Sequence, residues 1–177
     1  MLKQIHIYLF LIIPSLATGQ EIGICDLSIS GSSNLFEFLL TIEDSSQDEI
    51  SVLSIDSVLH FSIPTEIIKS SNPIVDHKIL QLINSDKHPE IIINTSSSYV
   101  DTLLSNPRKY ISIPAMVYLN GYWNQNYISA YKSNDKENTY ICKVVLFLND
   151  FNIKTNSKHS LVKVKERIEV FFLLGLA

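Results

Sequence analysis

The sequence contains little glycine: five residues in 177, none of them in a glycine-rich loop. Loops that cradle phosphate groups need glycine, because the backbone has to approach the ligand closely. No Gly-x-Ser-x-Gly motif is present, so nothing marks a nucleophilic serine at a strand-to-helix elbow. With no other catalytic constellation in the chain, the sequence predicts a protein that is not an enzyme.

Histidine is equally scarce. The histidines that follow the first 19 residues are His60, His77, His88 and His159. No two of them are four residues apart, and none lies beside a cysteine with the spacing of a zinc site. We therefore expect neither a bound metal nor another cofactor.

There are only two cysteines, Cys25 and Cys142. In an exported protein two cysteines can form a disulfide. Alternatively each is a separate small apolar side chain on its own strand. We favour two separate cysteines, but the spacing alone leaves both alternatives open.

Positive charge is in the minority, with 14 Lys and Arg against 18 Asp and Glu and a formal net charge of −4. A chain with this balance has no electrostatic reason to bind nucleic acid or anionic lipid head groups. Nucleic acid is therefore not an expected partner.

Charge is nearly absent at the N-terminus, where Lys3 is the only charged residue before Glu21. The apolar segment Ile5–Leu16 is about a dozen residues long, short of the ~20 that a spanning helix needs. Small residues follow it at Ala17 and Gly19, as a signal peptidase requires. Residues 1–19 thus predict a cleaved signal peptide, an exported periplasmic or secreted protein without a membrane span after cleavage, and a single domain over 20–177.

What the sequence does contain is strand-like alternation. The eight expected strands are Ile22–Ser30, Asn34–Glu43, Ile50–Ile63, Pro89–Ser98, Tyr110–Leu119, Tyr122–Tyr131, Tyr140–Leu148 and Val162–Leu174. Asn120-Gly121 separates the fifth strand from the sixth and is a strong signal for a type I′ hairpin.

One helix is expected, over Ser70–Lys87. Asn72 is a suitable N-cap, and Pro73 stands at the first helical position, where its missing N–H does no harm. Apolar residues recur at helical spacing on one face, and Asp76 is expected to face water together with the other polar side chains.

Eight strands with mostly short connections predict an all-β fold, an eight-stranded antiparallel lipocalin-like barrel with one short helix between the third and fourth strands. Closure into a barrel removes exposed sheet edges. A two-sheet sandwich is the structural alternative, but it would need longer crossings than the single helical one.

Four segments, in this order, resemble parts of YceI-like polyisoprenoid-binding domains. Asn72–Ile91 resembles the family's helix-into-strand segment, and Ile113–Gly121 its hairpin. Asn149–Ile153 resembles its Asp-Phe-Gly-Ile turn, and Val162–Leu173 its closing strand. The resemblance implies an exported lipocalin-like barrel with an elongated apolar cavity, which in some members holds a polyisoprenoid chain.

The chain also departs from the family pattern. The first strand, Ile22–Ser30, contains no histidine where the family has one, and Asn152 stands where glycine is typical. The chain therefore resembles a divergent member.

The expected function is a non-catalytic barrel that binds an apolar lipid or isoprenoid-like ligand in its interior. The candidate wall residues are Phe36, Phe38, Ile91, Ile93, Ile113, Val117, Phe147 and Phe172. Apolar burial would drive binding. The same residues could instead form a dry core, so the alternative is a structural or interaction module with a filled barrel and no ligand.

Aromatic residues gather around the Asn120-Gly121 turn. They are Tyr118, Tyr122, Trp123, Tyr127 and Tyr131. They either pair across strands and fix the register, which we favour, or surround the barrel mouth and hold a ligand head group.

Overall fold

The computed structural model describes residues 22–34, 37–42, 44–106, 110–155 and 164–176. The expected signal peptide, residues 1–19, and the candidate wall residue Phe36 lie outside these ranges. Within the described ranges, no helix is both long and apolar enough to cross a membrane.

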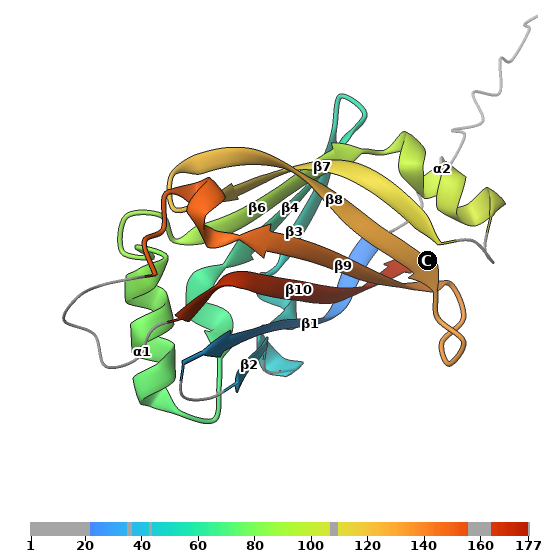
Figure 1. Cartoon of the computed structure of the whole chain (residues 1–177). Coiled ribbons are helices and arrows are strands. Elements are labelled where there is room, and N and C mark those ends of the chain that lie inside the picture. Colours follow the sequence, from blue (N-terminus) through green and yellow to red (C-terminus); the bar gives the residue numbers. More distant parts are fainter. Residues whose placement is uncertain (1–21, 35–36, 43, 107–109, 156–163, 177) are drawn as a thin grey trace, which may run out of the picture.

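The described strands form one antiparallel sheet, in the order β3-β4-β6-β7-β8-β9-β10-β1-β2-β5 (Figure 1). The strands are β1 (Ile22–Ser33), β2 (Glu37–Ile42), β3 (Ser51–Ile55), β4 (Val58–Pro64), β5 (Ile68–Lys69), β6 (Glu90–Ser96), β7 (Ile111–Leu119), β8 (Tyr122–Lys132), β9 (Thr139–Phe147) and β10 (Val164–Leu176). The helices are α1 (Pro73–Leu82) and α2 (Ser98–Ser105), with short 3₁₀ turns η1 (Asp44–Glu49), η2 (Thr65–Ile67) and η3 (Leu148–Phe151).

The all-β antiparallel class is confirmed, but the described residues form ten strands rather than eight. The expected strand 50–63 is in fact the hairpin β3–β4, which turns at Asp56 (φ 48°) and Ser57 (φ 65°). Positive φ at both central residues is type I′ geometry. Asp-Ser is not the usual residue pair for this turn, so nothing in the sequence marks the turn, and residues 50–63 resemble one continuous strand. The other additional strand, β5, has two residues and pairs with the end of β2.

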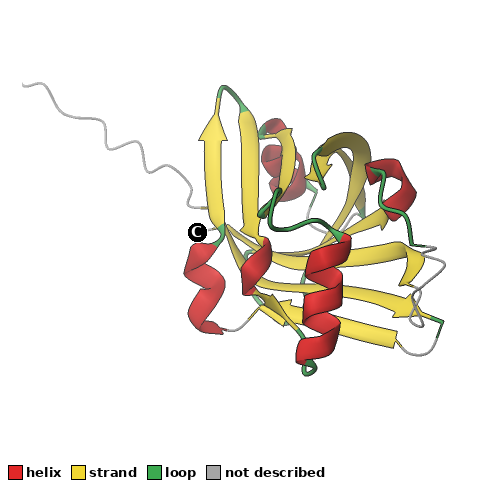
Figure 2. Ribbon diagram, turned by 90° about the vertical axis from the view of Figure 1, so that its left-hand side faces the viewer, coloured by secondary structure: helices red, strands yellow, loops and turns green. Residues whose placement is uncertain are grey.

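The sheet curls into a half-barrel rather than a fully hydrogen-bonded cylinder. Its two edge strands, β3 and β5, do not pair with each other. Instead, the chain itself crosses from β4 through η2 to β5 and so connects the two margins. Figure 2 faces the α1 end and shows the strands curling around the interior behind this helix.

Helix α1 begins as the sequence predicts. The Asn72 side chain accepts a hydrogen bond from the Ile74 N–H at 3.0 Å, and Pro73 occupies the first turn. The helix ends at Leu82, earlier than expected, and Asn84 (φ 56°) then turns the chain toward β6.

Helix α2 was not expected, because it is short and begins in a serine-rich segment that reads as a strand end. Val100 and Leu103 are its buried residues. The Tyr140 hydroxyl donates to the Leu103 carbonyl oxygen at 3.2 Å and ties α2 to β9. Figure 1 shows α1 and α2 at opposite ends of the curved sheet.

The two cysteines are both free. Cys142 is buried on β9, whereas Cys25 is exposed on β1, and β10 lies between the two strands. A disulfide would require the two cysteines to be close neighbours, and they are not. The structure therefore agrees with two separate side chains.

Candidate ligand-binding site

Most of the residues that were predicted to line the wall do face the interior of the barrel. The buried ones are Phe38, Ile91, Ile93, Ile113, Val117 and Phe172. Phe172 packs against Phe61 of β4 with ring centroids 6.1 Å apart. Their burial establishes an apolar interior, while contact with a ligand stays a prediction.

Phe147 does not face the interior as predicted. Its side chain is 48% exposed, whereas Val144 and Leu146 on the same strand are buried. Successive side chains of a strand point to opposite faces, so Phe147 faces outward. The run Val144–Leu148 is apolar on both faces, and for this reason the sequence could not show which face is internal.

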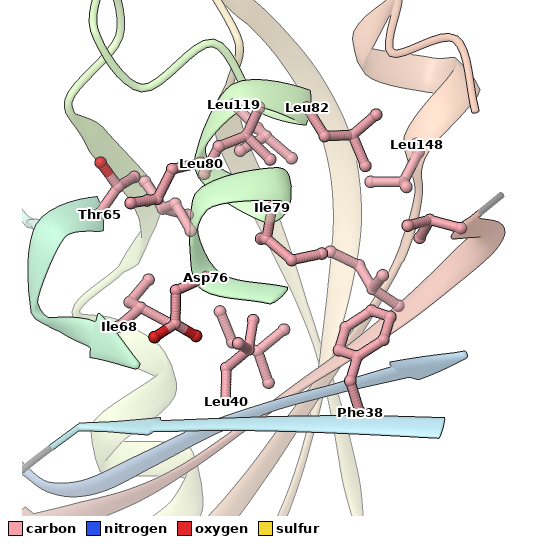
Figure 3. A pocket seen from close by; sticks show the side chains of 15 residues that line it. Phe38, Leu40, Thr65, Ile68, Asp76, Ile79, Leu80, Leu82, Leu119 and Leu148 are labelled. Carbon is pink, nitrogen blue, oxygen red and sulfur yellow. The ribbon is translucent and has the colours of Figure 1, made fainter. Parts of the chain in front are cut away.

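A small apolar cavity of about 30 Å³ lies beneath α1. Phe38 and Leu40 of β2 form one wall, and Ile79 and Leu82 of α1 form another (Figure 3). The Phe38 ring lies directly over Gly31 of β1, at the place where a Cβ of a larger residue would stand. Gly31 thus permits the close approach of this wall residue to the sheet.

A second apolar cavity, of about 20 Å³, lies at the α2 end. Ile113, Phe172 and the α2 residue Leu103 contribute to its lining. The candidate residues are therefore divided between the two ends: Phe38 and Ile91 line the α1 cavity, whereas Ile113 and Phe172 line the α2 cavity. Ile93 and Val117 line neither one.

Cys142 also lines the α2 cavity. Burial raises the pKa of its thiol to about 12. The side chain therefore stays protonated at neutral pH, and a thiol is a poor nucleophile compared with a thiolate. Among the described residues, no three His, Cys, Asp or Glu side chains are grouped so as to hold a metal ion.

Asp76 of α1 was expected to face water; it is half-buried and is among the residues around the cavity beneath α1, whose surface is almost entirely apolar. Its Oδ1 accepts a hydrogen bond from the Ser70 N–H at 2.7 Å. Helical residues three and four apart share a face, so its spacing from Ile79 and Leu80 could have indicated this position. The cavity role of α1, with Ile79 and Leu82, was likewise absent from the candidate residues.

Helix α1 packs against the core through side chains that are only partly buried. None of its residues is buried. The connection that carries it is closed at its base, where Thr65 donates from both its N–H and its hydroxyl to the Pro89 carbonyl oxygen, at 2.8 and 3.0 Å. The base is therefore fixed by the backbone of Pro89, immediately before β6, whereas α1 itself is only partly packed against the sheet.

The aromatic residues of the β7–β8 hairpin lie on the outside. Tyr118 and Trp123 are direct cross-strand partners with ring centroids 5.2 Å apart, and Tyr118 Oη lies 2.9 Å from Nδ1 of His88. Asn120 (φ 52°) and Gly121 (φ 84°) have the expected turn conformation. This arrangement agrees with the favoured interpretation, in which the aromatic residues pair across strands and fix the register. None of these aromatic residues lines the cavity beneath α1.

Comparison with solved structures identifies the fold. The chain is similar to a polyisoprenoid-binding domain from Saccharophagus degradans, described as implicated in plant cell wall breakdown, at a TM-score of 0.62 and 9% identity over 88% of this chain and 97% of that one. It is also similar to Burkholderia cenocepacia BcnA, at a TM-score of 0.59 and 10% identity over 86% and 95%. No protein-family model and no curated protein sequence matches the chain.

These similarities confirm the resemblance to YceI-like domains at the level of fold. The low sequence identity also agrees with the expectation of a divergent member, because about nine aligned residues in ten differ from the S. degradans domain. Shared fold does not transfer a ligand.

Proposed function

We propose that this chain, which folds like a polyisoprenoid-binding domain, is a non-catalytic carrier that encloses an apolar isoprenoid-like lipid. The observation that supports the proposal most directly is the apolar cavity beneath α1, where Thr65 and Asp76 are the only polar residues among the described residues of the lining. Lipid burial would be driven by about 25 cal/mol per Å² of apolar surface removed from water.

Ligand entry requires a change of shape. An apolar cavity of roughly 150 Å³ is needed for a molecule the size of benzene, and the cavity beneath α1 measures about 30 Å³. The described structure is thus a closed state. Uptake of a lipid chain must separate α1 from the sheet.

Helix α1 is well suited to be the moving element. It contributes Ile79 and Leu82 to the cavity, and its apolar residues pack against the core without being fully buried, so displacing it exposes only partly buried side chains. The hydrogen bonds of Thr65 to Pro89 would hold the base of the connection while the helix moves.

We further propose that the carrier is exported, on the basis of the signal-like residues 1–19. The mass of the protein recovered from its export route tests this proposal. Cleavage after Gly19 would leave Gln20 as the first residue, and retention of residues 1–19 would contradict it.

Binding is tested by native mass spectrometry of the exported protein mixed with a polyprenol. The expected result is a complex whose additional mass is that of one lipid and is lost in organic solvent. A protein that stays free of lipid at every polyprenol concentration would contradict the proposal and favour a filled barrel.

The site is tested by filling the cavity. Ile79→Trp places a large side chain in the α1 cavity and should reduce polyprenol uptake at least about tenfold, because the lipid would have to displace the indole. Ile74→Trp on the same helix is the matched control, since Ile74 is 67% exposed. Equal loss of binding in both variants would show that the ligand does not use this cavity.

A further inference from the structure

We infer that Phe61 limits the length of the isoprenoid chain that the barrel encloses, because its ring closes the interior between the two apolar cavities. The inference rests on the proposed function and deepens it by naming the chain-length class of the ligand: a short isoprenoid that occupies the α1 half of the barrel. Phe61 lies on β4, away from α1, the element proposed to move during lipid entry.

A single layer of described side chains separates the two cavities. Three successive interior positions of β6 show this: Ile91 lines the cavity beneath α1, Ile93 lines neither cavity, and Thr95 lines the cavity at the α2 end. Successive interior positions of a strand are two residues, or about 7 Å, apart. The same order recurs on β10, in the residues Ile168, Val170 and Phe172.

The residues of this separating layer are packed against one another. Phe61 pairs with Ile93 across β4 and β6, and Ile93 pairs with Val117 across β6 and β7. Further along the sheet, Val144 of β9 pairs with Val170 of β10. All five side chains are buried. Phe61 is the largest of them and the one aromatic residue among them.

The Phe61 ring reaches through the interior to a distant part of the sheet. Its centroid lies 6.1 Å from that of Phe172 on β10, although β6, β7, β8 and β9 separate β4 from β10 in the sheet. Neighbouring strands are about 4.8 Å apart, so the two rings meet only because the sheet curls and brings them together across its interior. The ring of Phe61 therefore lies in the path from the α1 cavity to the α2 end.

A lipid chain that enters beneath α1 would be buried until it meets the separating layer. Each additional isoprene unit removes apolar surface from water and strengthens binding while interior space remains. A longer chain either displaces the Phe61 ring from a packed core or leaves its remaining units in water, and neither adds affinity. Affinity should therefore rise with chain length and then reach a plateau.

A series of isoprenoid alcohols tests the inference, because geraniol, farnesol, geranylgeraniol and octaprenol differ only in their number of isoprene units. We expect the dissociation constant of the exported protein to fall at least about tenfold from geraniol to farnesol. From geranylgeraniol to octaprenol it should change by less than about twofold. Native mass spectrometry with pairs of these alcohols in competition gives the ratios.

Replacing the ring should move the plateau to longer chains. In Phe61→Ala, octaprenol should gain at least about fivefold in affinity relative to farnesol, because the chain continues into the α2 cavity. Phe61→Leu should shift the same ratio in the same direction by a smaller factor. It also provides the measurement if thermal melting shows that Phe61→Ala does not fold.

Phe151→Leu is the matched control for Phe61→Leu. Phe151 is fully buried, as Phe61 is, but it lines neither cavity. The substitution removes the same ring from the core at a different place, and it should leave the ratio of octaprenol to farnesol within about twofold of the unmodified protein.

The position of the chain end provides a readout that does not depend on affinity. Octaprenol with a diazirine at the end opposite its hydroxyl forms cross-links that mass spectrometry locates. In the unmodified protein no cross-link should reach Leu103 of α2, which lines the α2 cavity. In Phe61→Ala, cross-links at Leu103 are expected.

A dissociation constant that continues to fall through octaprenol in the unmodified protein would overturn the inference. Equal ratios of octaprenol to farnesol in Phe61→Leu and Phe151→Leu, or cross-links at Leu103 in the unmodified protein, would overturn it as well. Each of these results leaves the proposed carrier function standing, because a lipid is still bound. Binding of no member of the series would overturn that function, and the inference with it.

Discussion

At the scale of single residues, the most prominent feature of this protein is its large set of buried apolar side chains. Its interior is built mostly from Ile, Leu, Val and Phe side chains, and Asp76 is the one charged residue among the described residues that line the cavity beneath α1. The candidate residues at the centre of the barrel, Ile93 and Val117, line neither cavity and are 1% and 0% exposed. In the described structure both residues belong to the packed core, and their contact with a ligand stays a prediction.

Removing part of such a side chain should therefore affect stability. Ile93→Ala is expected to lower the free energy of unfolding by about 3 kcal/mol, because it removes apolar contacts and leaves a void. Ile74→Ala should change it by less than about 0.5 kcal/mol, because Ile74 is exposed. Urea denaturation measures both values, and a similar effect of the two substitutions would contradict the assignment of Ile93 to the core.

Because of the Cys142 thiol, the free energy of unfolding is expected to depend on pH in the alkaline range. Burial raises its pKa from an ordinary value of 9.0 to about 12 in the folded protein. The folded state holds the proton more tightly, so this contribution is fully present below about pH 9 and is lost as the pH rises toward about 12. The free energy of unfolding should fall over this window.

Cys142→Ala should make that decline shallower, whereas Cys25→Ala should not alter it, because Cys25 is exposed. Tyr140, whose pKa burial also raises, is present in both variants and cancels in the comparison. Denaturation curves between pH 8 and the alkaline limit of folding supply the measurement. Parallel declines in the two variants would refute the role of Cys142.

At the scale of elements, the β3–β4 hairpin replaces one expected strand, and α1, which begins where the sequence predicts, ends earlier than expected. The hairpin turns at Asp56 and Ser57, where positive φ is costly for a residue with a side chain. Helix α1 has a good cap but little burial. Both elements therefore owe their position to neighbouring structure as much as to their own sequence.

Relieving the turn should stabilise the protein. Ser57→Gly is expected to raise the free energy of unfolding by about 0.5–1 kcal/mol, because glycine adopts φ near 65° without steric cost. Ser51→Gly, within β3, should instead lower it by a similar amount, because glycine loses more backbone entropy in a strand. A destabilising Ser57→Gly substitution would show that the turn does not have type I′ geometry in solution.

At the scale of the whole molecule, stability should be unevenly distributed. Strand β9 is paired on both sides, with β8 and β10, and half of its residues or more are buried. Helix α1 covers the cavity without any buried residue. A lid over a binding site is expected to belong to the part of a protein that opens most easily.

Hydrogen exchange measured by mass spectrometry should show this difference. Amides of α1 are expected to exchange through local opening, well before those of β9, and bound polyprenol should slow them. Protection of α1 equal to that of β9 would contradict the proposed route of entry, since the helix would then open only when the whole protein unfolds.

The sequence by itself determined the features that depend on neighbours along the chain. Strand alternation gave the antiparallel all-β class, Asn72 and Pro73 placed the start of α1, and Asn120-Gly121 placed a hairpin. The burial of Phe38 and Ile91 followed from the same alternation, because the period of a strand assigns a side chain to one face.

Only the tertiary structure decided what depends on distant pairing. It placed Phe147 outside, because which face of β9 is internal is set by the curl of the whole sheet. It split the expected strand 50–63, left β3 and β5 as unpaired edges, and brought Asp76 to the cavity. Local propensities do not encode these choices, since each arises from contacts between segments far apart in the chain.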